Sequence, residues 1–205
     1  LTVSGNVALG VTGNAARDGT ITFTSGSALT AGSLTLGASG TTPGQGVITM
    51  TAGGTLSVGG AITVGTGSGT WTPGAGTVIL TGTAALPATI FTTFNNLTIN
   101  GGTTTMGAAL TIGGNLSIGD GATFTAGAFA LTVTGTTTVG GGTSGTLSIS
   151  SATGTKTFTG AVTINAGGGD MSVTFTGLLQ KDGTLAGALN FGQGEIPWTA
   201  TRVKG

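Results

Sequence analysis

The sequence predicts an all-β protein, a parallel β-solenoid of short strands with about 19 to 22 residues per coil. Three observations predict this class: aliphatic residues alternate with Thr or Ser, Gly interrupts each run, and the motif returns at a near-fixed interval. The aliphatic–Thr/Ser–aliphatic triplet stands at Leu34–Leu36, Leu56–Val58, Ile62–Val64, Leu97–Ile99, Leu110–Ile112, Leu116–Ile118, Leu131–Val133, Leu147–Ile149 and Val162–Ile164. A β-sandwich completed by a donated strand, Leu1 to Val11, is the alternative fold.

A near-fixed spacing defines the predicted coils. The spacings are 22, 22, 19, 19, 21, 19 and 17 residues if the coils start at Leu34, Leu56, Val78, Leu97, Leu116, Thr137, Lys156 and Val173. A coil of this length holds three short strands, and a finer step of six residues, as from Leu110 to Leu116, fits one strand and a tight turn. We therefore expect residues one coil apart to stack, with Leu97, Leu116 and the neighbourhood of Thr137 in one ladder.

Alternation within a triplet predicts which side chains enter the core. Leu110 and Ile112 should point inward and Thr111 outward, because successive side chains of a strand lie on opposite faces. β-branched Thr is stiff and favours strands, so it can coat a sheet without charge. Gly pairs such as Gly113-Gly114 mark corners, where the chain needs a positive φ or a close backbone approach. Helix is disfavoured because Gly and Thr are poor helix formers.

The segment from Trp71 to Phe94 departs from the regular triplets. It carries Pro73 and Pro87, and we interpret it as an elaborated coil with an inserted corner. The aromatic residues are expected to pack in the core or stack at corners, with an exposed carbohydrate platform as the alternative. This expectation is made for nine of the ten aromatic residues, namely Trp71, Phe91, Phe94, Phe124, Phe129, Phe158, Phe175, Phe191 and Trp198.

The two ends of the chain also differ from the repeats. Seven of the ten charged residues lie from Lys156 onward, so we divide the chain into a β-solenoid repeat domain, 1–177, and a C-terminal cap or junction segment, 178–205. A cap prevents uncontrolled pairing at a solenoid end. Residues 1–32 have no comparable charged cover, and strand-like sequence begins at once, so we expect that end to pair and the chain to be processed or cut from something longer.

Composition argues against catalysis. The chain has five basic and five acidic residues, no His and no Cys, so we expect no enzyme activity, no cofactor and no metal. Hexapeptide-repeat acyltransferases need a His base, β-helix lyases and hydrolases need clustered carboxylates, and calcium-binding repeats need Asp in successive turns. Asp120 stands alone between two Gly residues and is predicted to serve its turn, and Arg17-Asp18 is interpreted as a solvated turn pair.

The net charge is zero, so the chain has no excess of basic residues that would attract nucleic acid. Gly and Thr interrupt every apolar run, so no helix is expected to span a membrane. Repeated Thr on one strand face indicates a further hypothesis, ice binding by a flat hydroxyl array, although the repeats do not recur at one phase in every coil. The segments are Thr20–Thr24, Thr134–Thr138, Thr155–Thr159 and Thr174–Thr176.

The segment Phe94–Gly102 and the following TTTMGAALTIGGNLSIGDGATFTAGAFALTVTGTTTVGG resemble repeats of very large secreted bacterial surface proteins of the adhesin and filamentous-haemagglutinin-like kind. The resemblance covers residues 20 to 177. It implies an extracellular β-solenoid used as a stalk, fibre or surface layer. The charged tail has no counterpart in that pattern.

Together these observations predict a secreted structural protein that forms a filament, fibre or sheath at the cell surface. The expected partner is the protein itself in a head-to-tail homopolymer joined through strand edges, with a cell-surface or glycan ligand as a further partner. An ice-binding or carbohydrate-adhesive module of a large surface adhesin is the alternative function. The expected assembly interface comprises Leu1, Thr2, Val3, Val7, Leu9, Val11, Phe191, Ile196 and Trp198.

Overall fold

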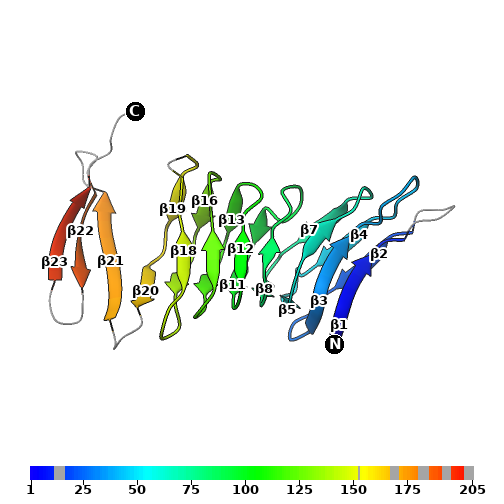
Figure 1. Cartoon of the computed structure of the whole chain (residues 1–205), viewed down its shortest axis with the longest axis horizontal. Coiled ribbons are helices and arrows are strands. Elements are labelled where there is room, and N and C mark those ends of the chain that lie inside the picture. The colour runs from blue at the N-terminus through cyan, green and yellow to red at the C-terminus, as the bar shows by residue number, and fades with distance from the viewer. Residues whose placement is uncertain (12–16, 152, 167–170, 180–184, 191–194, 201–205) are drawn as a thin grey trace.

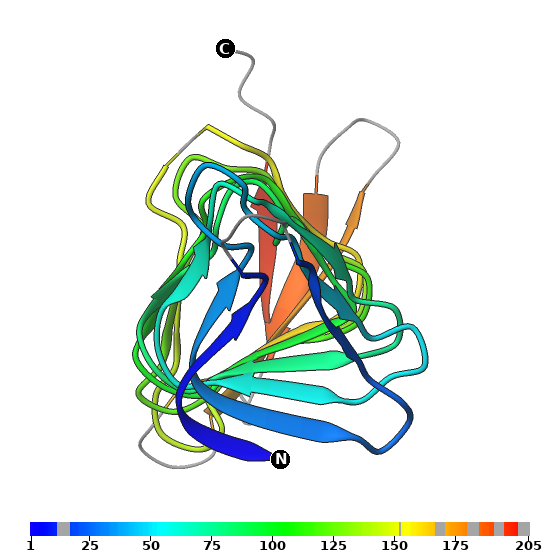
Figure 2. The ribbon, with the colours of Figure 1, turned by 90° about the vertical axis from the view of Figure 1, so that its right-hand side faces the viewer.

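The computed structural model describes residues 1–11, 17–151, 153–166, 171–179, 185–190 and 195–200. These residues form a parallel β-solenoid of about seven turns with no helix, and Figure 1 shows the coils stacked along the long axis. Seen along that axis, the coils lie one behind another around a shared core (Figure 2). The predicted fold class is confirmed, and the sandwich alternative is set aside.

The strands belong to four sheets. The 12-stranded sheet A runs in the order β1 (Thr2–Leu9), β3 (Ala28–Leu36), β5 (Thr55–Val58), β8 (Thr77–Leu80), β11 (Asn96–Ile99), β14 (Leu116–Ile118), β17 (Thr137–Val139), β20 (Val162–Ala166), β21 (Met171–Leu179), β22 (Leu185–Asn190) and β23 (Glu195–Ala200), with β6 (Ile62–Val64) also paired to β3. Sheet D holds β2 (Gly19–Thr22), β4 (Gly46–Thr49) and β7 (Gly69–Thr72). Sheet E holds β9 (Ala84–Ala85), β12 (Thr103–Thr105), β15 (Thr123–Thr125) and β18 (Thr146–Ser148), and sheet F holds β10 (Thr93–Phe94), β13 (Leu110–Ile112), β16 (Leu131–Val133) and β19 (Lys156–Phe158).

The expected central ladder is present in sheet A. Leu97 pairs with Leu116, and Leu116 pairs with Thr137. Leu110 and Ile112 are buried while Thr111 is exposed, which confirms the predicted facing of the triplets. Inward-facing aliphatic side chains of successive coils form one continuous core.

Two predicted coil starts are wrong. Leu34 does not begin the coil before Leu56, because β3 is nine residues long: its first half pairs Leu29 with Leu56, and its second half pairs Leu34 with Ile62. Lys156 does not follow Thr137 in sheet A, because it lies in sheet F and pairs with Leu131.

The predicted last coil start, Val173, is also wrong. Thr137 is followed in sheet A by Val162. Val173 pairs antiparallel with Ile164, so parallel stacking changes to an antiparallel meander between β20 and β21. That meander continues through β22 to β23.

Stacked polar side chains and Gly residues form the corners of the later coils. The Asn96 Oδ1 accepts the N–H of Asn115 at 2.9 Å, and the Asn115 Oδ1 accepts the N–H of Thr136 at 2.9 Å. A Cβ at Gly114 would lie 2.4 Å from the Asn96 Oδ1, and Gly140 has a φ of 81°. Both reasons given for Gly at corners therefore apply here, a close approach at Gly114 and a positive φ at Gly140.

Candidate functional site

The expected assembly residues of the N-terminal end lie on or beside β1, which pairs with β3 on one side only. Leu1 is 84% exposed, Val11 is 58% exposed and Thr2 is also exposed. The other three contact the core: Val3, Val7 and Leu9. Leu9 is buried, so its side chain supports the fold instead of offering a contact surface.

The C-terminal members of the expected interface lie at the other end of sheet A. Ile196 and Trp198 belong to β23, which pairs with β22 and is the last strand of the sheet. Phe191 lies outside the described residues. Pro197 stands between Ile196 and Trp198 and has no backbone N–H, so β23 carries one donor fewer than an ordinary strand.

The two end strands of sheet A run in opposite directions. The strands from β1 to β20 pair parallel, and three antiparallel steps follow from β20 to β23. Strand β23 is therefore antiparallel to β1. The structure places the two halves of the expected interface at opposite ends of one sheet, where they could meet only between two copies.

Strand β1 is irregular at its middle. The register shifts between Val3, which pairs with Ala31, and Asn6, which pairs with Ser33. A Cβ at Gly32 would lie 2.1 Å from the carbonyl oxygen of Ser4. Two residues of β1 thus face one Gly of β3, an arrangement typical of a β-bulge, and bulges restrict pairing at sheet edges.

Lys156 ends an apolar column of sheet F. It pairs with Leu131, which pairs in turn with Leu110. The ammonium donates to the carbonyl oxygens of Gly127, Thr153 and Gly154 at 2.9, 3.0 and 2.7 Å. All three ammonium donors are thus used to bind turns. The sequence marked Lys156 as the start of the charged region but did not indicate this role.

The Asp120 carboxylate holds the turn of the next coil. Its Oδ1 accepts four backbone N–H groups at 2.8 to 3.2 Å, those of Gly141, Gly142, Thr143 and Ser144. These bonds, led by those from Thr143 and Gly141, lower the pKa of Asp120 from 3.8 to about 2, while partial desolvation acts in the opposite direction. The predicted turn role agrees with this geometry, and the turn that is held belongs to the following coil.

Asp18 makes a similar contact in the first coils. Its Oδ1 accepts the backbone N–H of Gln45 at 2.7 Å. The interpretation of Asp18 as one half of a solvated pair with Arg17 missed this bond, because the partner lies 27 residues away in sequence. Asp18 and Asp120 therefore each bind a backbone N–H of the next coil.

The outer face of sheet E carries two columns of hydroxyl groups in register. One column holds Thr103, Thr123 and Thr146, and the other holds Thr105, Thr125 and Ser148. These positions are exposed or half-buried, and the described residues provide no hydrogen-bond partner for the six hydroxyl groups. The columns are spaced by about 7 Å along a strand and about 4.8 Å between coils.

This array extends the sequence interpretation of the Thr repeats. The sequence indicated that the Thr repeats do not recur at one phase in every coil; in sheet E, three successive coils do align their Thr and Ser side chains. Thr136, which belongs to a segment named from the sequence, lies instead at a corner and donates its hydroxyl to the Asn115 Oδ1 at 3.1 Å. The signal in the sequence was the repeat of Thr-x-Thr at 103 and 123, but only the register shows that the segments stack.

The aromatic residues follow the core prediction with one exception. Trp71, Phe91, Phe94 and Phe124 are buried, and Phe158 is half-buried against the core. Phe129 is exposed in the turn before β16. Side chains of Phe175 and Trp198 are not described, and Phe191 lies outside the described residues. The described aromatic residues therefore form no broad exposed platform.

Within the described residues, no three His, Cys, Asp or Glu side chains gather in a way that could hold a metal ion. Among those same residues, no helix has the length and apolar character needed to cross a membrane. The chain is a β-solenoid repeat protein. No protein-family model, curated protein or solved structure matches it.

Proposed function

We propose that this protein is a structural β-solenoid of a secreted bacterial surface protein, and that copies join end to end into a filament or fibre. The observation that carries the proposal is sheet A, a single 12-stranded sheet that runs through every described coil and has its two end strands antiparallel to each other. The repeat resemblance to adhesin and filamentous-haemagglutinin-like proteins supports the extracellular placement.

Edge pairing is the proposed mode of joining. Strand β1 of one copy would add to β23 of another in the antiparallel sense, which continues the meander from β20 to β23. Zero net charge supports this mode, because little charge repulsion opposes association. Lys156 disfavours stacking on sheet F, since a further coil would cover its ammonium. Stacking of a further coil on sheet F is therefore disfavoured, and sheet A is the proposed joining surface.

Thr2 offers a test of this mode. The carbonyl oxygen of Leu1 accepts the N–H of Thr30 at 2.9 Å, so the backbone of Leu1 faces β3 and that of Thr2 faces the open edge. Thr2→Pro removes a donor from that edge and leaves the β1–β3 bonds in place. We expect filaments in electron micrographs of the parent and of the control Thr2→Ala, and none for Thr2→Pro.

Circular dichroism should show that all three proteins are folded. A parent that stays monomeric at high concentration for days would contradict polymerisation and leave the chain as a stiff spacer. Filaments that persist in Thr2→Pro would contradict β1 as the joining strand.

A second candidate function rests on the hydroxyl columns of sheet E. Six aligned Thr and Ser side chains, for whose hydroxyl groups the described residues provide no partner, form an uncharged, regularly spaced face that suits ice or an ordered glycan surface. Thr125→Tyr would interrupt this face, and Thr111→Tyr on sheet F is the matched control. Thermal hysteresis or retention on crystalline cellulose that is lost only in Thr125→Tyr would support this candidate; equal behaviour of both variants and the parent would oppose it.

A further inference from the structure

Strand pairing is interrupted between the third and fourth coils. Coil three consists of β5, β6 and β7, and coil four consists of β8, β9 and β10. Sheet D ends at β7, while sheets E and F begin at β9 and β10. Within the described residues, sheet A alone passes through this boundary, where Thr55 pairs with Thr77 and Val58 with Leu80. Each later boundary, from coil four to coil seven, is crossed by three sheets.

Hydrogen bonds across the boundary show the same asymmetry. On the sheet A side, Thr77 N–H donates to the carbonyl oxygen of Gly54 and Thr81 N–H to that of Val58, both at 2.9 Å. On the opposite side, the indole Nε1–H of Trp71 donates to the carbonyl oxygen of Thr93 at 2.7 Å. That side chain bond connects β7 with β10, which no ladder joins in the described part of the chain.

The indole takes the place of a missing ladder donor. The carbonyl oxygens of Thr92 and Phe94 accept N–H groups of Thr111 and Gly113, both at 2.9 Å, on the side of coil five. Carbonyl groups of a strand alternate in direction, so the Thr93 carbonyl points back toward coil three. In an unbroken sheet it would accept a backbone N–H from that coil.

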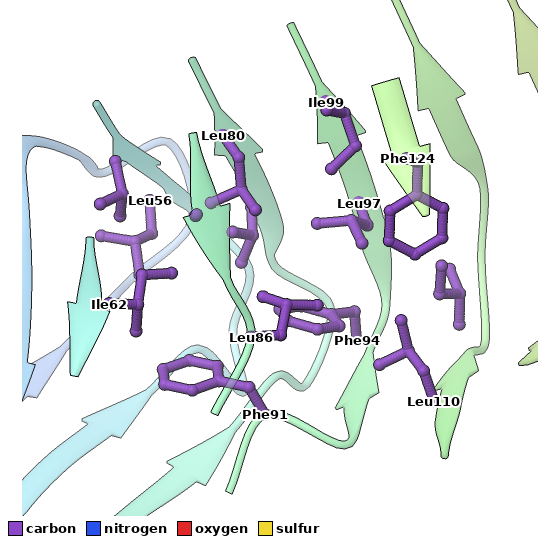
Figure 3. Packing of buried hydrophobic residues seen from close by; sticks show 14 of the residues in the cluster. Leu56, Ile62, Leu80, Leu86, Phe91, Phe94, Leu97, Ile99, Leu110 and Phe124 are labelled. Carbon is purple, nitrogen blue, oxygen red and sulfur yellow. The ribbon is translucent and has the colours of Figure 1, made fainter. Parts of the chain in front are cut away.

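Three aromatic rings pack together at the side of the boundary opposite sheet A. The ring centroid of Trp71 lies 5.0 Å from that of Phe91 and 5.6 Å from that of Phe94, and the two Phe rings are 6.1 Å apart. Figure 3 shows Phe91 and Phe94 in the core between Ile62 of coil three and Leu110 of coil five. We call Trp71, Phe91 and Phe94 the aromatic latch.

The sequence explains why the ladders stop. Coil four carries Pro87 between β9 and β10, and Pro73 follows β7; neither residue has an N–H for a ladder. Coil length changes as well. Leu1 lies 27 residues before Ala28, to which its ammonium donates, whereas Asn96 lies 19 residues after its partner Thr77. Length alone does not stop the ladders, because the coils from Leu97 to Leu116 and from Leu116 to Thr137 are 19 and 21 residues long and both keep three sheets.

We propose that the boundary between coils three and four is a built-in joint of the solenoid, with sheet A as its hinge and the aromatic latch as the contact that holds it closed. Stability in a stacked-repeat protein is the sum of the coils and their interfaces. Among the boundaries between the seven coils, this one has a single ladder where the others have two or three, so we expect the first three coils to separate there from the next four under load or heat. Figure 1 shows that the sheet A strands β1 and β3 are tilted, whereas β11 stands nearly upright.

Hydrogen exchange of the folded full chain tests the joint. Trp71→Phe keeps an aromatic ring and removes the N–H donated to Thr93. We expect amide exchange in β7 and β10 to accelerate by about tenfold, with β13 and β16 unchanged. Phe124→Leu is the matched control, because β15 is paired on both sides; it should not accelerate exchange in β7. The proposal would be overturned if the amide exchange rates of Trp71→Phe rose equally in all coils. It would also be overturned if the rates in β7 and β10 stayed unchanged.

A second measurement needs no change at the latch. In a Trp198→Phe background, Trp71 is the only indole of the chain. On heating, we expect acrylamide quenching of Trp71 to increase before the far-UV circular dichroism of the strands is lost, because the joint opens before the coils unfold. Coincident curves would overturn the proposal. This result is independent of filament formation, since it is measured on dilute monomer.

Discussion

The first three coils and the following four use the same alternating triplets but build different cross-sections. In the early coils, β3 runs for nine residues and pairs with β5 and then with β6. In the later coils, three-residue strands such as β12 and β13 each fill one face. Alternation therefore determines which side chains are buried, while the partner strands of the neighbouring coil determine how many separate sheets a coil supplies.

The largest expected effect comes from a charge placed in the regular coils. Leu116 is 1% exposed and lies between Leu97 and Thr137 in the central ladder. Leu116→Asp buries an unpaired carboxylate and should destabilise the protein by about 4 kcal/mol or more. Ser117→Asp, one residue away on the outer face, should change stability by less than about 0.5 kcal/mol. Urea unfolding followed by circular dichroism measures both; similar midpoints would contradict the assigned facing.

The corners of the two regions can be tested with one substitution in each. In the later coils the Asn115 side chain accepts from the backbone and hydroxyl of Thr136, so Asn115→Ala should cost about 1 to 2 kcal/mol. In the early coils the Gln45 contact with Asp18 uses the backbone N–H. Gln45→Ala should therefore leave the unfolding midpoint nearly unchanged. Equal losses in the two variants would show that the Asn115 side chain does not hold its corner through these bonds.

Two buried hydroxyl groups in the later coils give a prediction about stability. Thr104 and Thr137 are fully buried, and neither Oγ1 has a hydrogen-bond partner within the described residues. Thr137→Val keeps the shape and removes an unsatisfied polar atom, so we expect stabilisation by about 1 kcal/mol. The control Thr138→Val, on the outer face, should have a smaller effect. A lower melting temperature for Thr137→Val would indicate that its hydroxyl is bonded.

Acid sensitivity is the smallest expected effect and concerns Asp120. Its folded-state pKa of about 2 lies below the ordinary 3.8, so its contribution to stability is present above pH 3.8 and is lost as the pH falls toward 2. We expect the melting temperature of the parent to fall more steeply over this range than that of Asp120→Asn. Parallel pH profiles would contradict the role of the carboxylate in holding residues 141–144.

The sequence was sufficient for the class of fold and for much of the central ladder, because alternation and Gly spacing are local signals. It was insufficient at Leu34 and Lys156, where the same alternation fits two different faces and only the partner strand decides between them. The hydroxyl columns at Thr103 and Thr123 were missed for the same reason. Pro73 and Pro87 indicated an unusual coil, but the loss of two ladders depends on the neighbouring coil as well.

Lys156 bears on how such a chain can change in length during evolution. Duplication of one coil between β16 and β17 would place Leu131 beneath another aliphatic residue and lengthen the rod without burying a charge. The same duplication inserted after β19 would cover the Lys156 ammonium and displace the carbonyl groups that bind it. Growth by repeat duplication is therefore tolerated inside the column and opposed at its end, so a single cation sets where new coils can be added.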